Sequence, residues 1–388
     1  MDMPISGETI LIWPLLLTGF TVGVCGGFFG IGGAFMVTPT LNIFGFPMAY
    51  AIGTDMCHMI GKSIVSSFRH WKLGHVEVKL ALFMVIGTVP GVEAGAQTIM
   101  WLDRRGIAGP VVRYVYMAIL LSLGFYLLWE VAQAYKKART EGVVIKDVFG
   151  NRLTRFVQRT RLSPVAKLEK SGITLSVWWM ILIGAATGYL ASFMGVGGGF
   201  IRVPALLYVI GLPMKLAVGT DLFSIIFTSA YGGFSYAVKG VVEINAAVIM
   251  VVGAAIGAQI GSIATRYVHG LKMRLYFALC VFGSAFGLIA KQISTVYRDQ
   301  WMAGVRAFLA EGGRTALEIA EAIKDKIFIQ SLLAGRPEWS ALAGKEQFWT
   351  SLAGVLSIGL ASGLSFIIMY FCFKGILVEK RTGKILGA

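Results

Sequence analysis

The stretch GIGGAFMVTPTLNIFGFPMAYAIGTD, residues 30–55, recurs later in the chain as GVGGGFIRVPALLYVIGLPMKLAVGTD, residues 195–221. Both copies begin with clustered glycines, pass through two prolines and end in Gly-Thr-Asp, and the second copy has one extra residue between its prolines. The correspondence continues downstream through matched glycines and glutamates: Gly74 with Gly240, Glu77 with Glu243, and Gly87, Gly91 and Gly95 with Gly253, Gly257 and Gly261. In a membrane protein, Gly/Pro-interrupted segments at corresponding places of two repeated halves point to a transport site between the halves.

The composition is that of a membrane protein. Hydrophobic residues make up 56% of the chain and charged residues only 14%, and the mean hydropathy is +0.73. Soluble domains are nearer to about a quarter charged. Many windows of roughly 20 residues carry almost no charge, and about 20 residues is the length needed to cross the hydrocarbon core of a bilayer. We therefore predict an all-α polytopic membrane protein whose surroundings are lipid.

The charged residues lie mainly between the apolar runs. A net charge of +15 is compatible with nucleic-acid binding, but charges that cluster in loops are better explained by the excess of Lys and Arg in cytoplasmic loops, so we expect no nucleic-acid partner. The linker 136–170 contains ten basic and three acidic residues, which predicts a cytoplasmic position. The segment 294–347 contains seven of each and has helical apolar patterning, so we predict amphipathic helices on the opposite surface.

These charges constrain the number of crossings. With an outside N-terminus, five crossings per half place the linker inside and segment 294–347 outside, and an odd number makes the two repeats inverted. The second apolar run of each half is short, which predicts a broken or re-entrant segment that protein or a water-filled cavity must cover. The predicted parts are a first transmembrane repeat, a basic cytoplasmic linker, a second repeat, an extracytoplasmic insertion, and a final helix with a basic tail: 1–135, 136–170, 171–293, 294–347 and 348–388.

The glycine clusters are the first candidates for the binding site. Glycine permits a turn at membrane depth and lets backbone N–H groups approach an anion; the alternative is tight helix packing. Neither cluster is followed by Gly-Lys-Ser/Thr, so a soluble phosphate-binding loop is excluded. The candidate residues are Gly30, Gly32, Gly33, Gly195, Gly197 and Gly198. The Gly-x-x-x-Gly runs at 87–95 and 253–261 predict close helix packing instead.

The segment after the first Gly-Thr-Asp carries ionisable residues. Asp55, His58 and Lys62 are spaced i, i+3 and i+7, so they share one face of a helix. Ionisable groups in apolar segments are costly and face a bundle interior or water. Lys62 is a natural counter-charge for an anionic substrate; the alternatives are an ion pair with Asp55 or snorkelling to the cytoplasmic surface. The second half has Thr228 where the first has Lys62.

The remaining candidates surround these motifs. The Gly-Thr-Asp triplets add Thr54, Thr220 and Asp221 to the predicted substrate-binding residues. Arg202 is either a second anion contact or a charge at a helix end.

Cys25 and Cys57 flank the predicted site, where they either contact a sulfur-bearing ligand or pack inertly. Glu93 is either a proton relay or a hydrogen-bonded structural acid. No spacing of cysteines suggests zinc, and we predict neither a metal nor a cofactor.

At these residues the chain resembles the sulfite exporter TauE/SafE family of membrane permeases, also called the domain-of-unknown-function 81 group. The similar elements are GFFGIGGAFMVTP and FMGVGGGFIRVP, each followed by a Gly-x-Pro hinge, and the resemblance covers about 20–130 and 178–292 with the last crossing. It implies a transporter of sulfur-containing or organic anions, such as sulfite, thiosulfate or sulfonates, in the bacterial inner membrane. The linker 136–170, the insertion 294–347, and aspartates in place of the family's frequent hydroxyl residues at 55 and 221 depart from its pattern.

The sequence therefore predicts a small anion bound near the midplane between the glycine clusters, with Lys62 supplying positive charge and with proton or ion coupling. One alternative is a membrane-embedded enzyme, but His58 and Ser63 are five residues apart and point in different directions on a helix. We thus predict no catalytic residues. The other alternative is a non-transporting assembly or sensor protein, with the linker and the insertion as docking parts.

Overall fold

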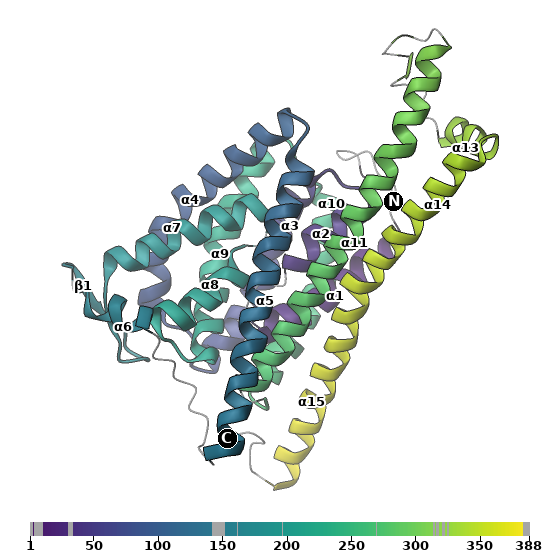
Figure 1. Ribbon diagram of the computed structural model, residues 1–388. Coiled ribbons are helices and arrows are strands. Elements are labelled where there is room, and N and C mark those ends of the chain that lie inside the picture. Colours follow the sequence, from purple (N-terminus) through teal and green to yellow (C-terminus); the bar gives the residue numbers. More distant parts are fainter. Residues whose placement is uncertain are drawn as a thin grey trace.

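The computed structural model describes residues 3, 11–29, 34–141, 152–160, 162–195, 197–268, 270–312, 315, 318, 319, 323 and 326–382. Within them the chain is almost entirely helical (Figure 1). Seven of the described helices are long and apolar enough to cross a bilayer. The predicted class, an all-α polytopic membrane protein, is confirmed.

Both halves contain five helical elements in the same order. The first half consists of α1 (Ile12–Phe29), α2 (Ala34–Ile43), α3 (Met48–Lys72), α4 (Val78–Arg104) and α5 (Ala108–Glu141). The second consists of α7 (Val177–Met194), α8 (Gly199–Ala205) with its π-helical continuation η1 (Leu206–Ile210), α9 (Met214–Val238), α10 (Ile244–Ala264) and α11 (Gly270–Glu311). Each element corresponds to one of the apolar runs of the sequence.

The second element of each half is short and broken, as the sequence predicts. Helix α2 has 10 residues with Pro39 inside it, and α8 has 7 residues with Pro204 inside it before η1 adds 5. At about 1.5 Å per residue, neither reaches across the roughly 30 Å hydrocarbon core. Both are followed by a left-handed glycine, Gly45 with φ 111° and Gly211 with φ 88°, which turns the chain into the next helix.

The turns of the two halves have the same backbone conformation. Gly74 and Gly240 have φ values of 75° and 74°. The glutamates that follow them match as well, with φ, ψ of −95°, 89° at Glu77 and −94°, 92° at Glu243. The repeated sequence is thus also a repeated local structure.

The helix that carries the Gly-x-x-x-Gly run in each half packs against the first helix of the other half. Helix α4 packs on α7, and α10 packs on α1. A Cβ added to Gly91 would lie 2.2 Å from the Ala185 carbonyl oxygen, and one added to Gly257 would lie 2.2 Å from that of Phe20. Only glycine allows backbones this close, so the predicted packing role of both Gly-x-x-x-Gly runs is confirmed.

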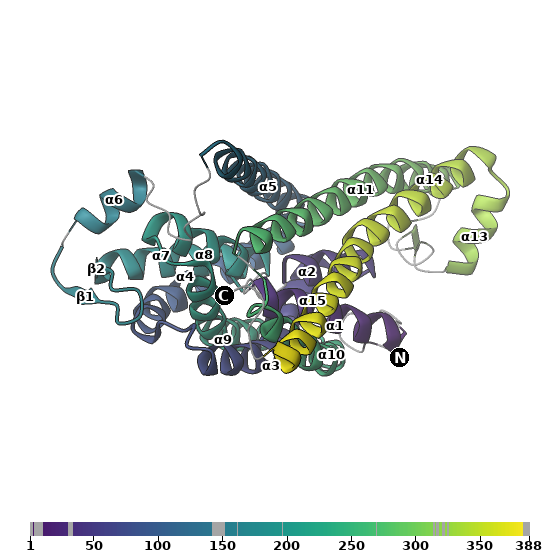
Figure 2. The ribbon, with the colours of Figure 1, turned by 90° about the horizontal axis from the view of Figure 1, so that it is seen from below.

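Helices α3 and α9 pack against each other (Figure 2). They run antiparallel, because the start of each lies against the turn that follows the other. The turn after α3 meets the start of α9, where a Cβ on Gly219 would lie 2.1 Å from the His75 carbonyl oxygen. The turn after α9 meets the start of α3, where a Cβ on Gly53 would lie 2.3 Å from that of Val241. Each half therefore begins its central helix against a turn of the other.

The described part of the linker folds against both halves, with its hairpin region on the first and α6 on the second. It contains α6 (Arg152–Arg159) and an antiparallel hairpin of β1 (Val165–Lys167) and β2 (Thr174–Ser176). The buried Glu77 carboxylate accepts hydrogen bonds from the backbone N–H groups of Glu169 at 3.2 Å and Lys170 at 2.8 Å. The hairpin thus lies at the surface formed by the turn between α3 and α4.

The predicted insertion is an arm that projects beyond the bundle (Figure 1). Helix α11 runs without interruption through the predicted boundary at residue 293 into the arm. The arm returns through α13 (Lys326–Ala334), α14 (Pro337–Gly354), the π-helical η2 (Val355–Gly359) and α15 (Leu360–Thr382). Trp301, Val305 and Leu309 form a second small core with α13 and α14, and this apolar face explains why α11 continues past the membrane-spanning part.

Candidate functional site

One face of α3 carries buried polar groups without partners. His58, Lys62 and Ser66 follow one another at intervals of four residues, and each side chain has 0% exposure. Among the described residues, none hydrogen-bonds to His58 Nε2, Lys62 Nζ or Ser66 Oγ. We name these three residues the α3 polar stripe. Ser63 Oγ, on the neighbouring face, is also buried and unpartnered within the described chain. Buried polar groups of this kind are costly unless something binds them.

Asp55, at the start of the stripe, has its own partners. Its Oδ2 accepts a hydrogen bond from Thr38 Oγ1 at 3.0 Å, and its Oδ1 lies 3.2 Å from His58 Nδ1. Within the described residues, no ion pair joins Asp55 to Lys62. Lys62 also does not reach solvent, since it is fully buried. The ammonium group is therefore neither paired with Asp55 nor extended to the surface.

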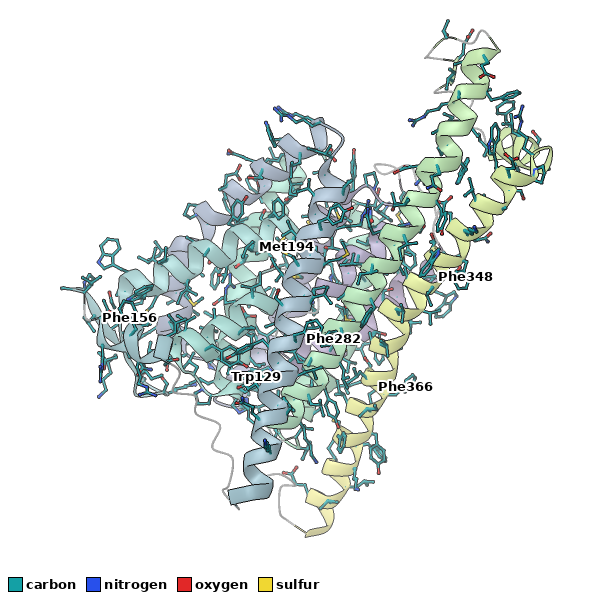
Figure 3. The ribbon with its side chains drawn as sticks, in the orientation of Figure 1. Trp129, Phe156, Met194, Phe282, Phe348 and Phe366 are labelled. Atoms are coloured by element: carbon teal, nitrogen blue, oxygen red, sulfur yellow. The ribbon has the colours of Figure 1, made fainter. Side chains whose placement is uncertain are left out.

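The second glycine cluster turns the chain directly against this face. Helix α7 ends at Met194 inside the bundle (Figure 3). Gly195, Gly197 and Gly198 then adopt φ values of 75°, 60° and 88°. A Cβ on Gly195 would lie 2.6 Å from Thr38 Oγ1, and one on Gly197 would lie 2.6 Å from Met59 Sδ of α3. The turn of one half thus contacts the ionisable helix of the other.

The first glycine cluster, Gly30, Gly32 and Gly33, lies outside the described residues. The end of α1 just before it is described, and the Gly27 carbonyl oxygen lies 3.0 Å from His70 Nε2. The equivalent carbonyl of α7, that of Ser192, accepts a hydrogen bond from Tyr236 at 2.8 Å. Both contacts satisfy a carbonyl that the end of a helix leaves without an intrahelical partner.

Arg202 is the buried cation of the second half. Its side chain has 0% exposure and donates to Thr187 Oγ1 at 3.1 Å, Asp221 Oδ1 at 3.4 Å and Thr228 Oγ1 at 3.3 Å. Arg202 is therefore not merely a charge at a helix end, because its guanidinium group connects α8 to α7 and α9. Asp221 Oδ2 has no hydrogen-bond partner among the described residues.

The two halves place their charges differently. Position 62 on α3 is lysine, and its equivalent on α9 is Thr228; position 202 on α8 is arginine, and its equivalent on α2 is Val37. In the described part of each half, one Lys or Arg side chain has 0% exposure, Lys62 or Arg202, and so does one aspartate. The cation lies on the long helix in the first half and on the broken helix in the second.

The threonines of the two Gly-Thr-Asp motifs bind backbone of the opposite half. Thr220 Oγ1 accepts the N–H of Glu77 at 2.9 Å, and Thr54 Oγ1 accepts the N–H of Glu243 at 2.9 Å. Both threonines are fully buried. The threonine is thus repeated in both halves because each copy holds the backbone of the other half.

Neither cysteine hydrogen-bonds to the unpartnered atoms of the α3 polar stripe. Cys25 on α1 faces α15, with Sγ 3.5 Å from Ser365 Oγ. Cys57 is half-buried on α3 and faces α9, where a Cβ on Gly233 would lie 3.0 Å from its Sγ.

Two residues of the site were missed by the sequence analysis. Thr38 connects Asp55 to Gly195, but its equivalent in the second half is Val203, so the repeat gave no signal for it. Ser66 does follow Lys62 by four residues, so extending the polar face by one further turn identifies it.

Broken helices, buried charges and unpartnered polar groups between two repeated halves define a multi-pass membrane transporter. The sequence model described as "Sulfite exporter TauE/SafE" matches residues 15–288, and the chain belongs to this family. A probable membrane transporter protein of Methanocaldococcus jannaschii is 30% identical over 61% of this chain and 76% of its own length. Another, from Xylella fastidiosa, is 27% identical over 73% of this chain and 92% of its own length. The comparison with solved structures gives no significant match.

Proposed function

We propose that this protein carries a small sulfur-containing or organic anion, such as sulfite, thiosulfate or a sulfonate, across the bacterial inner membrane. The observation that supports this most is the ammonium group of Lys62, which is fully buried and has no hydrogen-bond partner in the described chain. An uncompensated charge inside a membrane protein costs several kcal/mol, on the order of 2.5–3.5 kcal/mol at a helix centre. A bound anion offsets this cost.

The neighbours of Lys62 suit such an anion. His58 Nε2 and Ser66 Oγ lie on the same stripe, and both can bind anion oxygens when they carry a proton. The glycine turn 195–198 closes the opposite side through its contacts with Thr38 and Met59. Together with the first glycine cluster, Gly30, Gly32 and Gly33, it would supply backbone N–H groups to the anion. Asp55 and His58, which contact each other at 3.2 Å, are the candidates for proton coupling.

The proposed topology has two inverted repeats. The antiparallel packing of α3 and α9, each against a turn of the other half, supports it. The linker then lies in the cytoplasm and the arm outside, which agrees with their charges. Single cysteines in place of Lys167 and Lys345 test this in whole cells, on a background without native cysteines. We expect an impermeant maleimide to label the cysteine at 345 and not the one at 167; labelling of both from one side overturns the inverted arrangement.

Transport into proteoliposomes tests the role of Lys62. Labelled sulfite, thiosulfate and sulfoacetate are supplied to wild-type protein, K62Q and K62R. Loss of a charge-assisted hydrogen bond of about 1.5–3 kcal/mol predicts roughly ten- to a hundred-fold weaker apparent affinity in K62Q. K62R keeps the charge but changes its geometry, so we expect partial activity.

The matched control is K72Q, which removes an exposed lysine from the end of the same helix. Its uptake should equal that of the wild type. Unchanged anion affinity in a normally folded K62Q removes Lys62 from the site. Absence of uptake of every sulfur anion by the wild type, with uptake of another anion class, changes the substrate but not the role of Lys62.

A further inference from the structure

Helix α6 has one face attached to the bundle. Val157 is fully buried. Thr154 Oγ1 donates to the Tyr208 carbonyl oxygen at 2.6 Å, and Gln158 Nε2 donates to that of Ile210 at 2.8 Å. These carbonyls belong to η1, the last turn of the broken helix of the second half. The position of α6 is therefore fixed by hydrogen bonds to the transmembrane part.

The opposite face of α6 combines positive charge with exposed apolar surface. Arg155, Phe156, Arg159 and Thr160 line a cavity of about 400 Å³. Phe156 is 58% exposed, and Leu153 on the same helix is 50% exposed. Phe156 lies at the edge of the molecule, far from α11 and α15 (Figure 3). The two guanidinium groups suit a phosphate group, whereas the exposed apolar side chains suit hydrocarbon.

This cavity lies where a membrane-spanning helix begins. Trp178 and Trp179 are in the first turn of α7, and the ring of Trp179 is 6.3 Å from that of Phe156. Tryptophans at the end of a transmembrane helix mark the headgroup level of the bilayer. Residues 152–170 include six basic residues and one acidic residue, and basic segments at this level attract anionic lipids.

We infer that the α6 cavity binds the headgroup phosphate of an anionic phospholipid, with Arg155 and Arg159 on the phosphate and with Leu153 and Phe156 against the acyl chains. A soluble phosphate compound shares the phosphate chemistry but leaves the exposed leucine and phenylalanine without a partner. The bilayer offers both groups at the height of the cavity, so the lipid is the occupant that fits the whole surface. This inference does not depend on the transported substrate.

Native mass spectrometry of the full-length protein in neutral detergent tests it. Dioctanoyl phosphatidylglycerol is titrated against wild-type protein and R155Q/R159Q, with dioctanoyl phosphatidylcholine as the uncharged comparison. We expect the wild type to retain phosphatidylglycerol in preference to phosphatidylcholine. At about 1 kcal/mol per basic residue near the membrane surface, removal of two charges weakens this binding by roughly thirty-fold. Because both arginines are exposed, the variant should keep the thermal stability of the wild type in lipid-free detergent.

The matched control is R298Q/R306Q, which removes two arginines from another groove, lined also by Asp299 and Met302. It has the same change in charge and should keep wild-type lipid binding. F156A should weaken phosphatidylglycerol binding. Equal binding by the wild type and R155Q/R159Q overturns the inference, and so does equal retention of phosphatidylcholine. Displacement of phosphatidylglycerol by millimolar inorganic phosphate assigns the cavity to a soluble anion and overturns the lipid assignment.

Discussion

The two halves of this transporter share a skeleton but differ at their centres. In the second half, Thr228 donates to the Ser224 carbonyl oxygen of its own helix at 3.0 Å and accepts from Arg202. In the first half, the equivalent of Thr228 is Lys62, which has no hydrogen-bond partner in the described chain. The equivalent of Ser224 is His58, whose Nε2 is likewise unpartnered there. One centre is largely satisfied by its own residues, and the other presents free polar groups.

The difference shows that symmetry of packing does not require symmetry of chemistry. The glycines of the two Gly-x-x-x-Gly runs and the two threonines each contact backbone of the opposite half, so most other side chains at those positions lose the contact or clash. The central side chains meet each other and have no such constraint. We interpret the second half as the rigid support of the site and the first half as the part that binds.

The largest expected effect tests the supporting half. R202M leaves Asp221 buried without its cation, and breaking a buried ion pair in this way costs about 3–5 kcal/mol of stability. The free energy of unfolding, measured by denaturant titration in detergent, should fall by this amount. The double variant R202M/D221L should recover much of the loss. Full stability in R202M indicates that the second half does not depend on this network.

The same substitution in the binding half should have the opposite consequence. K62M replaces an unpartnered ammonium group with an apolar side chain of similar length, so stability should be unchanged or rise by about 0.5–2 kcal/mol. Anion affinity should fall as in K62Q. Denaturant titration without substrate, followed by a transport assay, gives both quantities. A stability loss as large as that of R202M shows instead that Lys62 balances Asp55.

Equivalent packing positions should respond equally. A Cβ at Gly91 or at Gly257 lies 2.2 Å from a facing carbonyl oxygen, so G91A and G257A each force helices apart at a cost of about 1–3 kcal/mol. Gly354 has no atom within 4 Å of its added Cβ, so G354A serves as the control and should not destabilise. The same titration measures the free energy of unfolding of both core variants. Unequal losses would show that the two helix contacts are not equivalent.

The smallest expected effect concerns the cross-half threonines. T54V and T220V each remove the acceptor of one backbone N–H, which costs about 1 kcal/mol. The two losses should be equal, and transport should persist in both variants. If either variant loses transport but keeps its stability, that threonine contributes to substrate binding and not only to packing.

Much of the fold was predictable from the sequence because hydrophobic length and glycine spacing are local signals. The apolar runs of both halves became helices, and the short second run of each half became a broken helix. The sequence also predicted a separate insertion at 294–347, but it did not predict that one helix runs through the first boundary of that insertion. The change in charge at residue 294 does not coincide with the end of a helix, because α11 continues without a break into the arm, where its apolar residues form the second core.

The candidate site was predictable in part. The shared face of Asp55, His58 and Lys62 follows from helical spacing, and Asp55 and His58 are in contact. The partners of Arg202 and of the two threonines were not predictable, because they come from segments far apart in the chain.

The sequence by itself determined the membrane class, the duplication and the positions of the buried charges, since these depend on composition and on spacing along one helix. Only the tertiary structure decided which charges are neutralised. Arg202 is surrounded by Thr187, Asp221 and Thr228, whereas Lys62 is surrounded by no such set among the described residues. The physical reason is that hydrogen bonds and ion pairs act over a few ångströms, and the groups within that range are chosen by how the helices pack.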